Sequence, residues 1–551
     1  MLTFRRHLLR RQRLAERHDF MSELLFELPL RSAERTPHAR ALVHKDTAVD
    51  YASLAQAIDR FSAAATGTLG IGKLERIAVY LPKVPETVVT MFGAARAGCV
   101  FVPVNPLLKP AQVGHILRDC NVSVLVTSGE RAATLTDELQ GCTDLRHLVL
   151  TGQDEPALLP GTHYTVHRWH DLRDGAGTPR PHRVIDTDMV SIFYTSGSTG
   201  RPKGVVLSHR NMVTGAHSVA SYLGNTPDDR LLAVLPFSFD YGFSQLSTAF
   251  HAGASVTLMD YLLARDILTA LSRERITGLA GVPPLWAQLT DLRWPATITE
   301  HLRYITNSGG AMPGATLQKL RDALPRTQVF LMYGLTEAFR STYLPPSEID
   351  NRPGSMGKAI PNAEIMVVRP DGSACEPDEP GELVHRGSLV SLGYWNDPVK
   401  TAERFKPSPG QDKGLVLTEL AVWSGDTVRM DQDGFLYFVG RRDEMIKTSG
   451  YRVSPTEIEE VVFASGLVAD AAAIGVPHPT LGQAVVLVAA PADGRTPDDG
   501  PLLDAIRKEL PAFMTPARVE WRVALPRNPN GKYDRAGLAA ELKGLYMAGA
   551  A

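Results

Sequence analysis

The order of apolar and polar stretches along the chain predicts strands that alternate with helices. From residue 76, short apolar runs at 77–81, 100–104 and 122–127 are separated by longer mixed segments at 87–97 and 110–117. Strands joined by helices of this length usually pair in parallel, so the pattern predicts parallel sheets flanked by helices. Further strands of this kind are expected at 231–235, 255–259 and 328–332.

The pattern changes twice in the second half of the chain. After residue 364, short apolar runs are joined by Asp-Gly turns at Asp371-Gly372 and Asp433-Gly434, which are typical of a small β-rich subdomain. Beyond residue 442, strands at 471–476 and 484–490 and a helix at 501–510 suggest a separate small α+β domain. We therefore expect an α/β protein with an N-terminal extension (1–24), a large domain with two parallel sheets (25–442, including the β-rich subdomain 364–442) and a small C-terminal domain (443–551).

Composition excludes several classes of protein. The chain has 551 residues, of which 44% are hydrophobic and 21% charged, and its net charge is −2. These values are typical of a globular protein and give no indication of a nucleic-acid partner. No apolar run reaches the roughly 18 residues of a transmembrane helix. The cysteines lack metal-ligand spacing, which favours reduced thiols and a cytoplasmic location; they are Cys99, Cys120, Cys142 and Cys375.

The N-terminus is rich in arginine. Leucines alternate with these arginines, so a basic amphipathic helix at a membrane surface is one interpretation. A disordered extension, or a true start at Met21, is the alternative that we favour. The arginine pairs are not followed by a continuous apolar segment, which argues against a secretory signal; the arginines are Arg5, Arg6, Arg10, Arg11, Arg13 and Arg17.

A loop rich in glycine and hydroxyl groups follows the apolar run at 189–193. Glycines let backbone N–H groups converge on an anion, hydroxyls add donors, and a lysine supplies positive charge, so the loop predicts a phosphate-binding site. The spacing is not that of a Walker A motif. A plain surface connection is the alternative interpretation. The candidate residues are Thr195, Ser196, Gly197, Ser198, Thr199, Gly200 and Lys203.

Further motifs follow this loop in a fixed order. The chain resembles the adenylate-forming superfamily from about residue 25 to 540, which includes acyl-CoA synthetases, adenylation domains of peptide synthetases and firefly luciferase. The resemblance implies a ligase that joins a carboxylate to AMP and then transfers the acyl group to a thiol. The motifs are Asn307–Pro313, Tyr333-Gly334-Leu335-Thr336-Glu337, Gly381-Glu382-Leu383, Gly393-Tyr394-Trp395, Trp423-Ser424-Gly425-Asp426, Gly440-Arg441-Arg442-Asp443 and Asn530-Gly531-Lys532.

The resemblance assigns roles in binding ATP and Mg²⁺. The loop from Thr195 to Lys203 would hold the β- and γ-phosphates, Thr336 would bond to the α-phosphate, and Glu337, with Thr195, would hold Mg²⁺. Asp426 would accept hydrogen bonds from both ribose hydroxyls, and Arg441 would approach the ribose and phosphate. The adenine slot is expected at Gly309, Gly310, Ala311, Met332, Tyr333 and Gly334. Tyr333 could equally be an aromatic residue of the core.

The resemblance also implies a mobile C-terminal domain. Lys532 would enter the active site and contact the substrate carboxylate and the α-phosphate in the first step. Asp443 matches the hinge position, and Gly450 would leave room for a pantetheine arm in the second step. The implied catalytic residues are thus Lys532, Thr336 and Glu337.

The acid substrate is less clearly indicated. Phe239, Asp240 and Gly309 are expected to line its site, and an aspartate at 240 resembles amino-acid-activating domains, where it pairs with a substrate ammonium. Asp240 could instead cap a helix. The segments 333–346 and 357–364 also look like stand-alone exosortase-associated acyl-CoA ligases and prolyl-carrier-protein ligases.

The acyl acceptor stays open between two thiols. One is CoA, and the other is the phosphopantetheine of a separate carrier protein, because no carrier motif follows Arg535. A non-catalytic adenylate-binding protein is disfavoured because Lys532, Glu337 and Asp426 are all present. A luciferase-like oxidase would share every motif, but nothing in the sequence argues for one.

Overall fold

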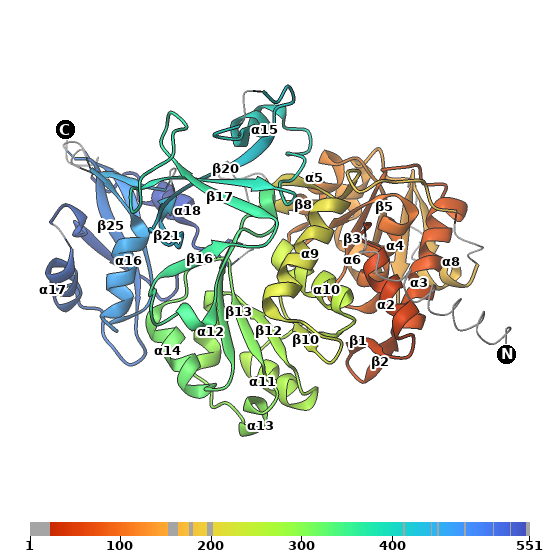
Figure 1. The fold of residues 1–551 in the computed structure, drawn as a ribbon, viewed down its shortest axis with the longest axis horizontal. Helices are drawn as coiled ribbons and strands as arrows, with labels where there is room; N and C mark the ends of the chain where they lie inside the picture. The colour runs from red at the N-terminus through yellow and green to blue at the C-terminus, as the bar shows by residue number, and fades with distance from the viewer. Residues whose placement is uncertain are drawn as a thin grey trace, which may run out of the picture.

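The structure is a computed structural model that describes residues 23–152, 163–175, 180–195, 202–411, 414–441, 444–448, 451–478, 481–510, 512–528 and 531–546. In Figure 1 the chain runs from a red and orange α/β layer, through a yellow and green one, to a blue C-terminal part. The described strands form three sheets. The predicted α/β fold, with a large N-terminal part and a small C-terminal α+β part, is confirmed.

The first sheet contains the strands predicted at 77–81, 100–104 and 122–127. Its order is β7-β6-β5-β3-β4-β8-β9, and its neighbours are parallel except for the antiparallel pair β8–β9. This antiparallel edge departs from the expected all-parallel sheet. The strands are β3 (Arg76–Tyr80), β4 (Val100–Pro103), β5 (Val122–Ser128), β6 (His147–Thr151), β7 (Thr165–Arg168), β8 (Met189–Thr195) and β9 (Lys203–Ser208).

The second sheet is parallel in its middle. Strands β1, β11, β10, β12, β13 and β14 pair in parallel in that order, and β2 closes one edge in antiparallel fashion. The strands predicted at 231–235, 255–259 and 328–332 are therefore present. These strands are β1 (Arg40–His44), β2 (Thr47–Asp50), β10 (Arg230–Ala233), β11 (Ser255–Leu258), β12 (Gly278–Gly281), β13 (Tyr304–Asn307) and β14 (Gln328–Tyr333).

The β-rich strands continue this second sheet. After β14, the sheet runs through β15, β16, β21, β20, β18 and β17, with β19 beside β20, and each of these pairs is antiparallel. The antiparallel strands thus begin before residue 364. They are β15 (Thr342–Leu344), β16 (Ser355–Ala359), β17 (Ala363–Val368), β18 (Gly381–Gly387), β19 (Phe405–Pro407), β20 (Leu420–Met430) and β21 (Leu436–Arg441).

Local sequence explains where the helices begin and end. In α9 (His209–Leu223), the Ser208 hydroxyl accepts from the Asn211 backbone N–H, and Gly224 ends the helix at φ +60°. Such a left-handed position favours glycine because it has no Cβ. The other helices of the large N-terminal part are α2 (Glu27–Arg35), α3 (Tyr51–Ala63), the π-helix η1 (Ala64–Thr68), α4 (Pro85–Ala97), α5 (Pro110–Asp119), α6 (Gly129–Thr134), α7 (Thr136–Gln140), α8 (Trp169–Gly175), α10 (Asp240–Ala252), α11 (Ala264–Arg273), α12 (Pro283–Thr290), α13 (Ala296–Thr299), α14 (Gly314–Ala323), η2 (Thr336–Ala338), η3 (Pro346–Glu348) and α15 (Pro398–Arg404).

Aromatic side chains fix the two N-terminal layers against each other. Phe92 of α4 stacks on Phe243 of α10, with ring centroids 5.8 Å apart, and Phe101 of β4 lies 5.4 Å from the same ring. All three side chains are fully buried. This packing holds α10, which carries Asp240 at its first position, firmly in the core.

The C-terminal part has a sheet of its own. Its order is β23-β22-β25-β24, with β26 parallel to β25, and apolar side chains are buried on both of its faces. Its elements are β22 (Ile446–Thr448), β23 (Tyr451–Val453), α16 (Pro455–Ala464), β24 (Val468–His478), β25 (Gly482–Pro491), α17 (Asp499–Glu509), η4 (Ala512–Met514), β26 (Arg518–Trp521) and α18 (Arg535–Glu541). In the described part of the chain, no helix is long and apolar enough to cross a bilayer.

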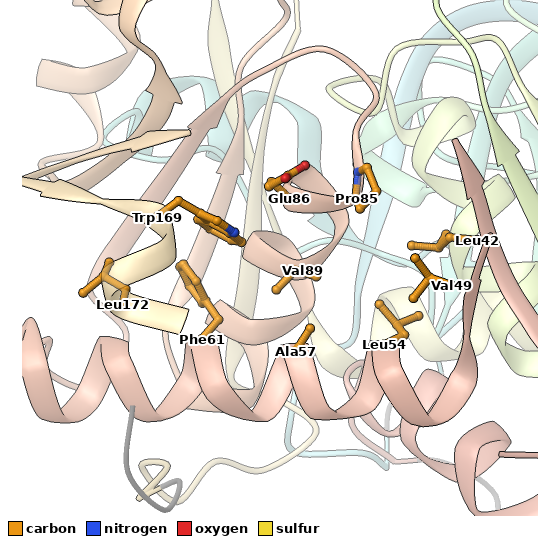
Figure 2. A pocket seen from close by; sticks show the side chains of 10 residues that line it. All are labelled: Leu42, Val49, Leu54, Ala57, Phe61, Pro85, Glu86, Val89, Trp169 and Leu172. Carbon is orange, nitrogen blue, oxygen red and sulfur yellow. The ribbon is translucent and has the colours of Figure 1, made fainter. Parts of the chain in front are cut away.

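An apolar cavity lies between α3, α4 and α8. Its volume is about 140 Å³, and Figure 2 shows Phe61 and Trp169 at one end and Leu42 at the other. Glu86, at the start of α4, contributes a carboxylate to its wall. None of the expected site residues lines this cavity. Leu42 of β1 and Val49 of β2 extend its lining to the second sheet, so it belongs to the packing between the two layers.

Candidate active site

The phosphate-loop candidates lie between β8 and β9. Thr195, the last residue of β8, pairs with Lys203, the first residue of β9. The antiparallel pairing brings the two ends of the loop together at one edge of the first sheet. The residues Ser196, Gly197, Ser198, Thr199 and Gly200 lie outside the described residues.

Strand β9 is joined to the Gly393-Tyr394-Trp395 motif by backbone hydrogen bonds. The Val206 N–H donates to the Gly393 carbonyl over 2.9 Å, and the Trp395 N–H donates to the Gly204 carbonyl over 2.7 Å. As a result, the Lys203 ammonium lies 5.5 Å from the centre of the Tyr394 ring. Strand β9 also contacts η2, which carries Thr336 and Glu337. Segments far apart in the sequence thus converge at this point.

Glu337 is held by the Tyr394 hydroxyl. That hydroxyl donates to Glu337 Oε1 over 2.5 Å, and the half-buried Arg404 guanidinium is close enough for the Glu337 charge to raise the Arg404 pKa against the effect of burial. Among the described residues, no group of three or more His, Cys, Asp or Glu side chains could hold a metal ion. With Arg404 near it and no cluster of metal-binding side chains among the described residues, the Glu337 carboxylate fits Mg²⁺ only when phosphate oxygens complete the shell of the ion.

Asp426 forms the centre of a second cluster. The Tyr333 hydroxyl donates to Asp426 Oδ2 over 2.5 Å, and Arg441 Nε lies 3.4 Å from Oδ1. Oδ1 is buried and accepts no hydrogen bond from the described residues. Burial raises the pKa of Asp426, while Arg441, the Tyr333 hydrogen bond and the charge of Lys532 oppose this rise. An acceptor-only carboxylate with an unfilled oxygen fits a ligand that presents hydroxyl donors.

The backbone before Asp426 is shaped by a buried serine and a glycine. The Ser424 hydroxyl donates to the Leu383 carbonyl over 2.7 Å and accepts from the Asp426 N–H over 3.1 Å. Gly425 has φ +71°, and a Cβ there would lie 2.6 Å from a guanidinium nitrogen of Arg404. Glycine therefore lets Arg404 approach the carboxylate of Asp426.

The expected adenine residues lie at the carboxyl ends of β13 and β14. Tyr333 ends β14 and Gly334 follows it, whereas Met332 is buried and its sulfur accepts from the Tyr222 hydroxyl. The Asn307 side chain donates to the Gly310 carbonyl over 3.0 Å. This loop also contains Gly309, at φ +82°, and the exposed Ala311.

Asp240 is buried at the first position of α10. Its Oδ1 accepts from the Thr336 hydroxyl over 2.8 Å, which links the expected acid site to the expected α-phosphate site. Burial raises the pKa of Asp240, and the Arg340 charge and the Thr336 hydrogen bond oppose the rise. Phe239 precedes it, and a Cβ at Gly309 would lie 4.0 Å from the Phe239 ring. The three expected substrate residues are therefore neighbours.

Lys532 lies on a braced loop of the C-terminal part. Arg527 donates to both oxygens of Asp470 over 2.9 Å, and the Tyr533 hydroxyl also bonds to Asp470. The backbone of Lys532 exchanges hydrogen bonds with Asn528. Its side chain is exposed, yet its charge lowers the pKa of Asp426. The loop thus holds Lys532 near enough for its charge to act on Asp426.

Three side chains that the sequence did not assign to the site also lie in it. Asp443 and Gly450 lie outside the described residues, so their hinge and channel roles remain predictions. The sequence marks Tyr394 only as part of a motif, and it marks neither Arg404 nor Arg340. The positions of these three side chains depend on long-range pairings that no local signal reveals.

Family models match most of the chain. The model described as AMP-binding enzyme matches residues 30–395, and the model described as AMP-binding enzyme C-terminal domain matches residues 457–532. The first match covers the Lys203, Glu337 and Asp240 region, and the second ends at Lys532. Asp426 and Arg441 lie between the two matched ranges.

Similar proteins include acid–CoA ligases and a peptide synthetase. The chain is 31% identical over 514 residues to feruloyl-CoA synthase of an Amycolatopsis species, covering 92% of this chain and 96% of that protein. It is 30% identical over 512 residues to a linear gramicidin synthase of Brevibacillus parabrevis, covering 92% of this chain but 6% of that much longer protein.

Solved structures agree in fold. One is o-succinylbenzoate–CoA synthetase (MenE) of Bacillus subtilis in complex with ATP and a magnesium ion. It is 26% identical, with a TM-score of 0.79 and coverage of 93% of this chain and 98% of that one. The chain therefore belongs to the AMP-binding enzyme family, among the adenylate-forming enzymes of the acid–CoA ligase type.

Proposed function

We propose that this enzyme activates a carboxylic acid with ATP and Mg²⁺ to an acyl-adenylate and then transfers the acyl group to the thiol of CoA. The observation that carries the proposal is the convergence of three groups. These are Glu337 with Tyr394 and Lys203, Asp426 with Tyr333 and Arg441, and Lys532, whose charge acts on Asp426. They match the phosphates, the ribose and the reacting centre of one bound nucleotide.

In the first half-reaction, a carboxylate oxygen of the acid bonds to the α-phosphorus of ATP, and the bond from that phosphorus to pyrophosphate breaks. Such a displacement depends on positioning and charge neutralisation. Thr336, on η2, is the proposed donor to the α-phosphate, and Lys532 is the proposed cation between the carboxylate and that phosphate. Asp426 holds the ribose, which fixes the line of attack.

Mg²⁺ would be held by Glu337, with Thr195 as the second proposed ligand, and supplies charge neutralisation for the triphosphate when bound. The Tyr394 hydroxyl orients Glu337 through one of its oxygens. Lys203 and the hydroxyl-rich loop before it are proposed to bind the β- and γ-phosphates. In these roles, cations and N–H donors stabilise the negative charge of pyrophosphate as it leaves.

In the second half-reaction, the CoA thiol loses its proton to solvent, its sulfur bonds to the acyl carbonyl carbon, and the bond from that carbon to the AMP oxygen breaks. We propose that the C-terminal domain turns about Asp443 between the steps, which withdraws Lys532 and brings Gly450 to the thiol channel. One cleft then carries out two reactions in turn.

CoA is favoured over a separate carrier protein as the acceptor. The proteins that this chain matches over nearly their full length include a feruloyl-CoA synthase, whereas it matches only a small part of the peptide synthetase. Loading of an amino or imino acid onto a carrier, as in prolyl-carrier-protein ligases, remains the second candidate.

The surroundings of Asp240 argue against the amino-acid alternative. The carboxylate already accepts from Thr336 and lies within the field of the buried Arg340 guanidinium. A buried carboxylate with a protein cation beside it has no need of a substrate ammonium. Asp240 is therefore proposed to position Thr336, whose hydroxyl donates to it.

We further propose that the enzyme works in the cytoplasm. ATP and CoA are intracellular substrates, and all four cysteines are free, with Cys99, Cys120 and Cys142 buried. Unpaired buried thiols are typical of a reducing compartment.

The test is ATP–pyrophosphate exchange over fatty, aryl, dicarboxylic and amino acids, followed by thioester formation with CoA. We expect exchange with an acid that lacks an amine, and thioester formation when CoA is added. Exchange driven only by amino acids, with no CoA thioester, would replace the proposal by carrier loading. Absence of exchange with every acid would refute ligase activity.

A further inference from the structure

Arg340 is a buried cation in the expected acid site. Its side chain is 2% exposed, and it follows Phe339, which closes the turn after Glu337 at φ +55°. A buried guanidinium cannot lose its charge, so its N–H groups need acceptors. The structure supplies one: Arg340 Nη1 donates to the Ser308 hydroxyl over 3.1 Å.

The other edge of Arg340 has no acceptor. Nε and Nη2 are both buried, and neither has a hydrogen-bond partner among the described residues. These two nitrogens form the side-on fork of a guanidinium, which binds both oxygens of one carboxylate through parallel hydrogen bonds. A native protein rarely leaves such a pair of buried donors unsatisfied without a functional reason.

The surroundings of Arg340 belong to the acid and nucleotide site. The guanidinium lies 4.7 Å from the centre of the Tyr241 ring, next to Asp240, and a Cβ at Gly334 would lie 3.5 Å from Nη1. Ser308 precedes Gly309, the expected substrate residue. Arg340, two residues after η2, therefore lies against Tyr241 of α10 and against Ser308 in the loop after β13.

Asp240 does not fill the fork. Its Oδ1 accepts from Thr336, and neither Nε nor Nη2 hydrogen bonds to it, although the charge of Arg340 lowers its pKa. The group that this pocket lacks is therefore an acceptor and not a donor. An ammonium group would add donors beside unsatisfied donors.

We propose that Arg340 binds a second carboxylate of the substrate, so that the acid activated by this enzyme is a dicarboxylic acid. This inference rests on the proposed ligase function and names its substrate class. One carboxylate of the diacid attacks the α-phosphorus, and the other lies on the Nε and Nη2 edge of Arg340. A monoacid would leave the fork unpaired, whereas a diacid supplies two oxygens and a negative charge.

The test compares diacids with their half-methyl esters. Both members of a pair carry one carboxylate that can be activated and have the same chain, so ATP–pyrophosphate exchange isolates the second carboxylate. The panel contains aliphatic diacids from malonate to sebacate, and one aromatic pair, phthalate and its monomethyl ester. We expect kcat/KM for at least one diacid to exceed that of its half-ester by about tenfold or more.

Arg340→Gln and Arg340→Lys then test the residue. We expect Arg340→Gln to lower the diacid to half-ester ratio to about one, and Arg340→Lys, which keeps a charge but not the fork, to give an intermediate ratio. Because both substrates are measured on one preparation, the ratio does not depend on how much of a variant is folded. The comparison of each diacid with its half-ester is itself made on the unmodified enzyme.

The possible outcomes distinguish a failure of the role proposed for Arg340 from a failure of the proposed ligase function. Exchange with monoacids, with no diacid preferred over its half-ester, would overturn the role of Arg340 and leave the ligase function intact. A diacid preference that survives in Arg340→Gln would overturn it as well. Absence of exchange with every acid would refute the proposed function itself, and this inference with it.

Discussion

The Tyr394 hydroxyl donates to Glu337 Oε1 over 2.5 Å, although the two residues are separated by 57 positions in the sequence. Tyr394 is carried there by the hydrogen bonds between β9 and residues 392–395, which also set Lys203 beside its ring. A tyrosine thus orients the proposed metal carboxylate and lies next to the proposed phosphate lysine.

Replacing Tyr394 by phenylalanine removes this orienting hydrogen bond. Partners that orient a metal ligand typically contribute about tenfold to a hundredfold in metal affinity. We expect Tyr394→Phe to raise the Mg²⁺ concentration for half-maximal ATP–pyrophosphate exchange roughly tenfold. The Mg²⁺ dependence of exchange at saturating ATP measures this effect.

The matched control is Tyr80→Phe, which loses a hydroxyl bonded to the Leu108 carbonyl in the first sheet. Its Mg²⁺ dependence should equal that of the unmodified enzyme. An unchanged Mg²⁺ requirement in Tyr394→Phe would show that Glu337 is oriented without the tyrosine.

Lys532→Ala should separate the two half-reactions. A unit charge about 4 Å from the reacting phosphate, at an effective dielectric of about 20, contributes roughly 4 kcal/mol. That energy corresponds to roughly a thousandfold loss in the rate of adenylate formation. Thiolysis of a supplied acyl-adenylate by CoA should be retained. The exposed Lys543 provides a control, Lys543→Ala. Equal loss of both half-reactions in Lys532→Ala would contradict the assignment.

Asp426→Asn should weaken recognition of the ribose. Asp426 Oδ1 has an unfilled acceptor position among the described residues, and an amide offers one acceptor fewer than a carboxylate. We expect the KM for ATP to rise about tenfold, with a smaller change in kcat. The KM for 2′-deoxy-ATP is the diagnostic measurement: the unmodified enzyme should discriminate against it, and the variant should not. Equal discrimination in both enzymes would mean that Asp426 does not bind the ribose.

Stability should fall in acid because of a buried histidine. His385 of β18 is fully buried, its Nδ1 pairs with the Ser341 hydroxyl over 2.9 Å, and burial lowers its pKa from 6.5 to about 3. A pKa lowered on folding gives stability that is present above pH 6.5 and lost as the pH falls toward 3, because only the unfolded chain binds the proton. At pH 5 the loss is about 2 kcal/mol.

His385→Asn tests this dependence, because asparagine cannot titrate there. The decrease in the free energy of unfolding between pH 7.5 and 5, measured by urea denaturation, should be smaller by about 2 kcal/mol in the variant. His301→Asn, at a partly exposed position, is the control. The same pH dependence in all three proteins would show that His385 is not responsible.

Local patterns predicted β3, β4, β5, β10, β11 and β14 because parallel strands buried on both faces are continuous apolar runs. The run at 100–104, for example, appears as β4, which is buried along its whole length. The joining of the β-rich strands to the second sheet could not be predicted. It depends on the pairing of Ser355 with Tyr437, across more than eighty residues, and no local property of either segment specifies that partner.

The site was predictable where residue type and motif carry the chemistry, as for Asp426 and Glu337. Arg340 was not predictable, because its position depends on the backbone at Phe339. Phe339 has φ +55°, and its ring occupies the position that a Cβ at Gly215 would need. This backbone conformation places Arg340 next to Gly334. From sequence alone, an arginine after this motif is indistinguishable from a surface charge.

Strand β21 pairs Arg441 with Asp426 and ends there, just before the expected hinge residue Asp443. A rotation about that hinge would leave the ribose carboxylate and its arginine on the stationary side and carry Lys532 away on the moving side. The bound nucleotide would then lie close to the rotation axis and would not move with the C-terminal domain. The rotation would replace Lys532 by the thiol channel while AMP stays bound at Asp426. Release of AMP would then be the last event of the cycle.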